Sequence, residues 1–397
     1  MKMEKPAIEG GKPVREKFLP YGLHWVGEEE VEAVADTLRN GWLTAGPKVK
    51  QFEQEFAEYV GAKHAVAVSS CSAALHLALL AHGVGKGDEV ITSPQTFCSV
   101  ANAVLHAGAK LVLADVKEDF NISPEEIAEK ISGKTKAIIP TDYAGVPCDY
   151  DEIMKIGREH GLKVIGDAAC SVSATYNGRK VGSICDATCF SFHPVKNMTT
   201  AEGGIITTDD GGVAEKARML RFHGITKEYL KRFESGNSWF FEMRMLGFKY
   251  LMTDLQASIG LCQLKKLGKF EELREKIAGK YDAAFKNMPE ILLPKKYKHG
   301  KRAWHIYVIR IKPGMMRVDR NHLIEALRKE NIGAVVHYIP VYEHPYYEQL
   351  GFKKKDYPVC EELYETAITL PLFAKMSEED SGDVIEAVKK IIEYYKK

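Results

Sequence analysis

The chain has 397 residues, 45% of them hydrophobic, and its 55 basic and 54 acidic side chains leave a formal net charge of +1. This balance gives no reason to expect a nucleic-acid partner, and no apolar run is long enough to span a membrane. The length favours a globular protein of two domains. Because residues 1–6 contain no apolar signal core, we expect a cytoplasmic protein.

Helical and strand patterns alternate along the first half of the chain. We expect helices at 28–39, 100–106 and 124–131, and strands at 64–68, 89–93, 110–114, 137–141, 163–167 and 190–192. Such alternation is typical of crossover units on a mostly parallel sheet, in which ligands bind at the carboxyl ends of the strands. The pattern predicts an α/β fold with a site at that edge of the sheet.

The pattern changes beyond Gly211. An irregular segment covers 223–250, and its length favours a functional role. A long helix is predicted at 253–288, followed by a strand at 303–309, a helix at 320–330, a short strand at His337 and a helix from Ser377. We therefore expect a large domain at 1–252, and at 253–397 a linking helix with a smaller α+β domain.

A turn rich in hydroxyl groups follows the first predicted strand. Ser69-Ser70-Cys71-Ser72 separates that strand from the apolar-periodic Ala73–Leu79, which we expect to be helical. Free amides at a helix N-terminus, with serine hydroxyls beside them, bind phosphate. The turn matches neither the Walker nor the dinucleotide-binding pattern. Ser70 and Ser72 taken alone favour ordinary helix N-caps.

Two later strand ends deliver a carboxylate and a lysine. Asp167 ends one apolar strand, and Lys196 follows the strand at Phe190-Ser191-Phe192. An enzyme that uses pyridoxal phosphate (PLP) holds the cofactor as a Schiff base on a lysine and keeps its ring nitrogen protonated with a carboxylate. Alone, Asp167 could cap a turn and Lys196 could be a surface charge. Together with the serine turn, they predict a PLP site.

The eight cysteines do not suggest a disulfide framework or a metal site. Their spacing contains no C-x-x-C motif and one C-x3-C pair, and most of them lie in apolar segments. Free thiols in a reducing compartment are the simpler interpretation, so we expect no metal.

Eight segments, in order along the chain, carry a resemblance to a known family. They are Gly41–Pro47, Ser70–Leu75, Asp142–Gly145, Gly166–Ala169, Phe190–Lys196, Glu202–Gly204, Asp254–Ala257 and His337–Pro340. The chain resembles the DegT/StrS nucleotide-sugar aminotransferases from about Gly10 to its C-terminal helix. The resemblance implies the fold-type-I PLP-dependent transferase fold, with a mostly parallel seven-stranded sheet.

The resemblance also implies roles for individual residues. Lys196 matches the Schiff-base lysine and Asp167 the partner of the ring nitrogen. The phosphate is expected at Ser70, Cys71, Ser72 and Ser191, while Phe97 matches the aromatic that stacks on one face of the ring and Ala169 the small residue under the other. Phe97 could equally be a core aromatic.

Two positions depart from the family pattern. Cys170 stands where many members have Gln or His bonded to the ring hydroxyl, and a thiol is a poor hydrogen-bonding group. Lys249 stands where many have Asn reaching the neighbouring subunit's phosphate, which a lysine can still reach as a point charge. A solvated surface lysine is the alternative for Lys249.

The substrate residues implied by the resemblance are Trp42, Thr44, His193, Arg244, His337 and Tyr338. We expect transfer of an amino group from L-glutamate to a UDP-linked 4-keto-6-deoxy-hexosamine, in a homodimer with shared active sites. The alternatives are a dTDP- or GDP-linked 3- or 4-keto sugar, a sugar dehydratase, which would lack Lys196, and a PLP-fold regulator. A regulator would carry an appended DNA-binding module, for which the chain has no room.

Overall fold

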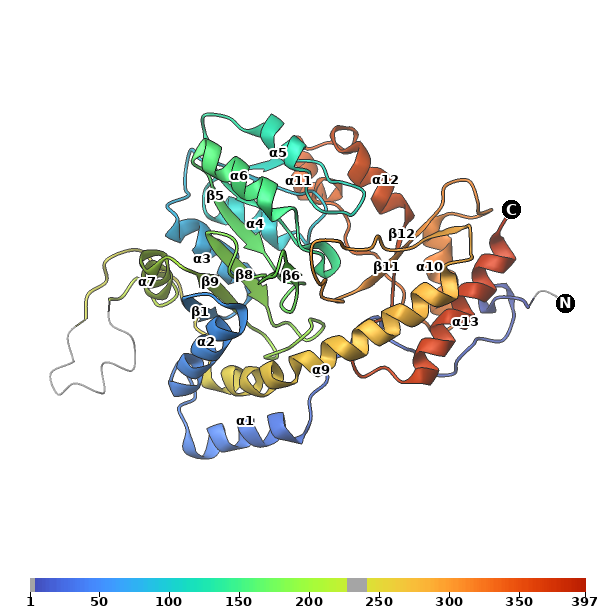
Figure 1. Cartoon of the computed structure of the whole chain (residues 1–397), viewed down its shortest axis with the longest axis horizontal. Helices are drawn as coiled ribbons and strands as arrows, with labels where there is room; N and C mark the ends of the chain where they lie inside the picture. Colours follow the sequence, from blue (N-terminus) through green and yellow to red (C-terminus); the bar gives the residue numbers. More distant parts are fainter. Residues whose placement is uncertain (1–3, 227–240) are drawn as a thin grey trace.

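The computed structural model describes residues 4–226 and 241–397, which build a seven-stranded and a three-stranded sheet joined by a long helix (Figure 1). The larger sheet has the order β1-β9-β8-β5-β4-β2-β3. Its strands are β1 (His64–Val68), β2 (Glu89–Thr92), β3 (Lys110–Leu113), β4 (Thr135–Ile139), β5 (Lys163–Asp167), β8 (Ala187–Ser191) and β9 (Gly204–Thr208). β9 is antiparallel to both β1 and β8, and the other pairings are parallel. The predicted mostly parallel α/β sheet is confirmed.

Helices cover both faces of this sheet because its buried strands present apolar side chains on each face. Val66 and Val68 of β1 belong to one core cluster, and Ala65 and Ala67 to another. The first cluster packs under α3 (Cys71–Ala81), α4 (Ser99–His106) and α7 (Gly211–Leu220). The second includes α2 (Pro47–Val60), α5 (Pro124–Lys130) and α6 (Tyr150–His160). The helix α1 (Glu28–Asn40) packs on α9 (Asp254–Phe285).

The long helix α9 (Asp254–Phe285) runs from α1 and α2 to the C-terminal part (Figure 1). Its N-cap is Thr253, whose hydroxyl accepts from the Gln256 amide at 3.2 Å. The smaller sheet is antiparallel and contains β10 (Ile291–Leu292), β11 (Tyr307–Ile311) and β12 (Ala367–Leu370). With α10 (Arg320–Lys329) and α13 (Glu378–Tyr395) it shares a third core cluster.

The remaining elements are short. They are the hairpin β6 (Thr175–Tyr176) with β7 (Arg179–Lys180), α11 (Pro345–Gln349), α12 (Pro358–Thr366), and 3-10 turns at Ala7–Glu9, Tyr143–Gly145 (η2), Val341–Glu343 and Lys354–Asp356. Among the described residues, no helix combines the length and apolarity that a bilayer crossing requires.

Two of the predicted strands differ from the structure: one begins later than expected, and the other does not form. The strand expected at 303–309 is β11, which begins only at Tyr307, because the Ala303 amide donates to the carbonyl of Gly145 in η2. No strand forms at His337. Its carbonyl accepts instead from the hydroxyl of Tyr143 and, at 3.0 Å, from the side-chain amide of Gln95.

The predicted long helix at 253–288 is confirmed as α9. The helices α2, α6 and α7 were not among the expected elements. Of the irregular segment at 223–250, residues 227–240 lie outside the described part. The division at residues 252 and 253 stays a prediction, and it falls at the N-cap of α9.

Candidate active site

Several strands end at one edge of the large sheet, where a cavity of about 260 Å³ opens. Since β1, β2, β4, β5 and β8 all run the same way, their carboxyl ends meet at this edge, beside the start of the reversed strand β9. The predicted site residues among those lining the cavity are Ser70, Cys71, Ser72, Phe97, Asp167, Ala169, Cys170, Ser191, His193, Lys196, His337 and Tyr338. The sheet topology therefore brings together residues that lie far apart in the sequence.

The N-terminus of α3 forms one wall of the cavity. Ser70 caps the helix, its hydroxyl accepting from the Ala73 amide at 3.1 Å. The amides of Cys71 and Ser72 have no acceptor among the described residues. Both amides belong to residues that line the cavity. A helix N-terminus with free amides suits a phosphate group.

Gly204, the first residue of β9, allows β9 to approach this wall. A Cβ at Gly204 would lie 2.4 Å from the carbonyl carbon of Ser70 and 2.5 Å from the amide nitrogen of Cys71. Backbone atoms cannot yield as a flexible side chain can, so a larger residue would displace the N-terminus of α3. The close packing of β9 against the start of α3 beside the cavity thus explains the last glycine of the Glu202-Gly203-Gly204 motif.

We expect Gly204→Ala to destabilise the fold by about 1–3 kcal/mol through overpacking and to weaken PLP binding by moving the Cys71 amide. Gly268→Ala is the control, because a Cβ at Gly268 has no atom within 4 Å and the residue lies inside α9; it should stabilise the helix by up to about 1 kcal/mol. Denaturant unfolding and a PLP titration measure both effects. Unchanged cofactor affinity in Gly204→Ala would contradict this packing account.

Asp167 is buried at the end of β5. Its carboxylate accepts from the Ala169 amide at 3.1 Å and from the Thr141 hydroxyl at 3.2 Å. Burial raises the pKa of this carboxyl, and the Ala169 amide and the charge of Lys196 offset the rise only in part. A cationic ring nitrogen against Asp167 would favour the ionised form, so the site has the electrostatics that a pyridinium requires.

The Lys196 amine lies in the same cavity, 3.3 Å from the thiol of Cys170. Burial is the largest influence on the pKa of Lys196 and lowers it, but Cys170, Asp167 and Cys71 outweigh it, so that the pKa is raised. The Cys170 thiol is buried, and burial raises its pKa above the ordinary value. Cys170 thus lies beside the lysine, and its sulfur is also 3.9 Å from the hydroxyl of Tyr338.

Aromatic residues close the other side of the cavity. Phe97 is 58% exposed although it lines a cavity, which leaves its ring available to a ligand and argues against a core role. Its ring centroid is 5.8 Å from that of Tyr338. His337 is buried, with Nδ1 3.0 Å from the Thr369 hydroxyl.

Burial and the nearby charge of Lys196 lower the pKa of His337 to about 3, from an ordinary value of 6.5. A histidine buried in the neutral form stabilises the fold above pH 6.5, and this contribution is lost as the pH falls toward 3. We expect His337→Gln, which cannot take up the proton, to flatten the decline in unfolding free energy over this interval by about 1.4 kcal/mol per pH unit.

Chemical denaturation at a series of pH values measures this slope. His24→Gln is the matched control at an exposed histidine and should behave like the wild type. Equal slopes in wild type and His337→Gln would show that His337 does not contribute.

Four predicted residues do not line the cavity of this chain. Trp42 is 37% exposed, and the carbonyl of Thr44 accepts from the Asp254 amide at the start of α9. Arg244 is exposed and pairs with Glu242 at 3.1 Å. The Lys249 amine lies 4.5 Å from the ring centroid of Phe222. Their roles stay predictions.

The structure adds lining residues that the sequence did not indicate as site residues. They are Tyr21, Thr96, Ser99, Thr141, Val195, Glu202 and His305. Val195 and Glu202 lie inside recognised segments, and Thr96 and Thr141 directly precede Phe97 and the Asp142–Gly145 segment, so position beside or within a motif was an available signal. Tyr21 and His305 come from a loop and from an expected strand, and no sequence pattern marked them.

Comparisons with known proteins agree with this geometry. A sequence model of the DegT/DnrJ/EryC1/StrS aminotransferase family matches residues 25–389. The chain is 49% identical over 381 residues to the spore coat polysaccharide biosynthesis protein SpsC of Bacillus subtilis, covering 95% of this chain and 98% of SpsC.

Solved structures match over nearly the whole chain. The putative sugar aminotransferase Spr1654 from Streptococcus pneumoniae, in its PMP form, has a TM-score of 0.89 and 34% identity, with 95% of this chain and 99% of that chain covered. Its PLP form also has a TM-score of 0.89. PseC from Helicobacter pylori, an aminotransferase involved in the biosynthesis of pseudoaminic acid, has a TM-score of 0.89 and 30% identity, with 96% and 100% covered.

The cavity fits PLP, the cofactor named for one of the Spr1654 structures. It offers an amine at Lys196, a buried carboxylate at Asp167, free amides at the start of α3 and an exposed aromatic ring at Phe97. These are the groups that an aldehyde, a pyridinium nitrogen, a phosphate and a planar ring require. The chain belongs to the DegT/DnrJ/EryC1/StrS family and is a PLP-dependent sugar aminotransferase.

Proposed function

We propose that the protein transfers the amino group of L-glutamate to the 4-keto group of a UDP-linked 4-keto-6-deoxy-hexosamine. The observation that carries the aminotransferase chemistry is the shared cavity of Lys196 and Asp167. The choice of sugar is supported by the 30% identity to PseC, an aminotransferase involved in the biosynthesis of pseudoaminic acid. The similarity to SpsC, a polysaccharide biosynthesis protein, agrees with a nucleotide-linked substrate.

In the proposed mechanism, Lys196 carries the cofactor between turnovers and moves the proton at the substrate carbon in both half-reactions. When bound, PLP supplies an electrophilic carbonyl and an electron sink. Asp167 would keep the ring nitrogen of PLP protonated, and the Cys71 and Ser72 amides with the Ser191 hydroxyl would hold its phosphate. Phe97 and Ala169 would contact the two faces of the PLP ring.

Three cavity residues are proposed to hold the sugar. They are His193, His337 and Tyr338, which come from the loop after β8 and from the segment before η3 (Val341–Glu343). Because the low pKa of His337 keeps it neutral, it would hydrogen-bond a sugar hydroxyl without adding charge.

The visible absorbance of the bound cofactor tests the proposal. L-glutamate should remove the absorbance of the lysine-bound cofactor, and the UDP-4-keto-6-deoxy-hexosamine should restore it. Loss of this absorbance without its return would support L-glutamate as the amino donor and favour a dTDP- or GDP-linked keto sugar as the acceptor. No response to glutamate in a protein loaded with PLP would refute the donor assignment.

A second proposal is that two subunits complete each site. Lys249 and Arg244 are exposed and lie outside the cavity of their own chain, as residues that serve a partner's site would. Mixing Lys196→Ala with Lys249→Ala should restore part of the activity, because a mixed dimer can hold one site with both lysines intact. If heterodimers form from two inactive variants and no activity returns, Lys249 does not reach across.

A further inference from the structure

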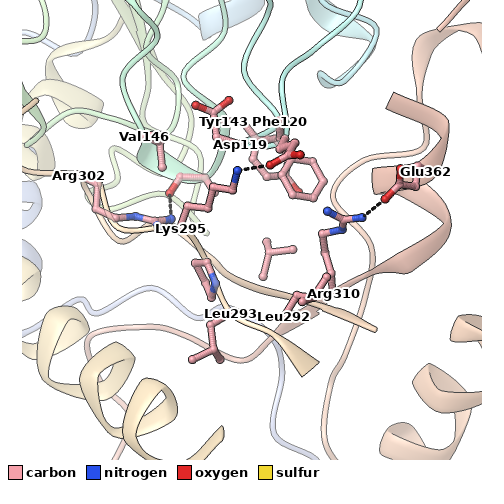
Figure 2. Close-up of a pocket in the computed structure, with 14 residues that line it drawn as sticks. Asp119, Phe120, Tyr143, Val146, Leu292, Leu293, Lys295, Arg302, Arg310 and Glu362 are labelled. Carbon is pink, nitrogen blue, oxygen red and sulfur yellow. Dashed lines mark hydrogen bonds and ion pairs between the residues drawn. The ribbon is translucent and has the colours of Figure 1, made fainter. Parts of the chain in front are cut away.

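A second cavity, of about 390 Å³, lies between the two sheets and shares no lining residue with the catalytic one (Figure 2). Asp119 and Phe120 reach it from the segment after β3, and Tyr143, Ala144 and Val146 from η2 and the residue that follows. The opposite wall comes from Leu292 of β10, Val308 and Arg310 of β11 and Glu362 of α12. A ligand here would touch both parts of the fold.

The acidic and basic side chains that line this cavity are equal in number, but not all of them form ion pairs. Lys295 pairs with Glu118, Arg310 pairs with Glu362 at 2.6 Å, and Asp119 lies 3.3 Å from the Lys117 amine. Arg302 forms no ion pair among the described residues, and Asp282, the carboxylate whose charge acts on it, does not line the cavity. The lining therefore leaves one positive charge without a counter-charge.

Arg302 is buried, with only 9% of its surface exposed. Within residues 4–226 and 241–397, its side chain forms one hydrogen bond, to the carbonyl of Ala144 at 3.3 Å, and its Nε meets no acceptor. The guanidinium lies 3.8 Å from the centroid of the Trp304 ring, and Figure 2 shows it reaching toward the cavity. Burial lowers the pKa of Arg302 to about 10 although Asp282 raises it, so the cation lacks full compensation.

The other lining side chains are mostly apolar, and two of them are stacked aromatic rings. The rings of Phe120 and Tyr143 stack at 4.4 Å with an interplanar angle of 10°. Leu292, Leu293, Pro294 and Val308 face the same space. Such walls favour a ligand with a planar apolar body, oriented by a few polar contacts.

We propose that this cavity binds a small aromatic monocarboxylate, with its carboxylate on Arg302 and its ring among Phe120, Tyr143 and Leu292. A single unpaired cation matches one negative charge, and the planar guanidinium fork suits a carboxylate. Glu118, Asp119 and Glu362 around the same cavity disfavour a phosphate dianion. The inference does not rest on the proposed sugar substrate.

The site has a direct connection to the catalytic cavity. Tyr143 lines the second cavity, and its hydroxyl donates to the carbonyl of His337, which lines the catalytic one. A ligand stacked on Tyr143 would thus contact the side chain that holds the His337 segment in place.

Calorimetric titration of the PLP-loaded enzyme with benzoate tests the proposal, with benzamide as the neutral isostere and inorganic phosphate as an anion without a ring. We expect benzoate to bind at millimolar concentration more tightly than either. Arg302→Met should weaken benzoate binding about tenfold to a hundredfold. Lys295→Met, which removes a charge that Glu118 already neutralises, should have a much smaller effect.

Leu292→Trp gives an independent check. Leu292 is 38% exposed at the cavity wall, so a larger side chain can fill the space without disturbing the core, and benzoate binding should be lost even if Arg302→Met fails to fold. Neither residue lines the catalytic cavity, so loss of binding in these variants locates the ligand. Absence of benzoate binding to the wild type, undiminished binding in Leu292→Trp, or equal or tighter binding of benzamide or phosphate would each overturn the proposal.

Discussion

Replacing Lys196 with alanine is expected to abolish amino transfer while the fold remains intact. The variant would lack the proposed covalent anchor of the cofactor and the proposed proton carrier, and positioned proton transfer alone contributes about 10²–10⁴-fold in rate. In the described structure the Lys196 amine forms one hydrogen bond, to the Cys170 thiol at 3.3 Å, so the fold depends little on this side chain. Steady-state turnover measures amino transfer, cofactor absorbance measures attachment of the cofactor, and circular dichroism measures whether the fold is intact.

Lys163→Ala provides the matched control for this experiment. Lys163 begins β5, the strand that ends in Asp167, but its amine pairs with Asp186 at 3.3 Å and does not line the cavity. Its removal should leave turnover and absorbance near the wild-type values. Substantial turnover in Lys196→Ala would remove Lys196 from its proposed role.

Asp167→Asn is expected to lower kcat by about 10²–10³-fold, the loss typical of removing one preorganised electrostatic group. Asparagine has the same size; its one oxygen can still accept from the Ala169 amide, and its NH2 group can donate to the Thr141 hydroxyl, so the site should keep its shape. It carries no negative charge, and the ring nitrogen would lose the partner that keeps it protonated. The expected result is a retained cofactor with a slow reaction.

The control for this variant is Asp142→Asn, a second buried aspartate that does not line the cavity. Asp142 accepts from Ser171, Tyr150 and the Cys148 amide, and burial raises its pKa to about 7. Its replacement should change stability more than kcat. If both variants lost kcat equally, the effect of Asp167 would be structural rather than electrostatic.

The catalytic edge of the sheet was predictable because its residues follow recognisable strand ends. Ser70, Asp167 and Ser191 each come directly after or at the end of a short apolar run, and parallel pairing brings such ends together. The same logic fails for His337, whose backbone is held by Gln95 and Tyr143 rather than by a strand partner. Side-chain contacts to a backbone carbonyl over such sequence distances leave no periodic pattern.

The second cavity illustrates another limit of the sequence. Arg302 and Phe120 are far apart in the chain, and neither stands in a motif. Only the placement of β10 and β11 against the segments after β3 and β4 shows that Arg302 forms no ion pair with the acidic residues that line this cavity. A missing counter-charge is a property of the assembled surroundings and not of the residue.

The catalytic cavity takes residues from Tyr21 to Tyr338, and this spread constrains when the enzyme can acquire its cofactor. A chain emerging from the ribosome presents Ser70, Asp167 and Lys196 long before the segment that carries His337 and Tyr338. Because synthesis proceeds from the N-terminus, an incomplete chain has an open cofactor site with one wall missing. Stable loading is therefore expected late in synthesis or after release, and truncated chains that end before residue 337 should retain PLP poorly.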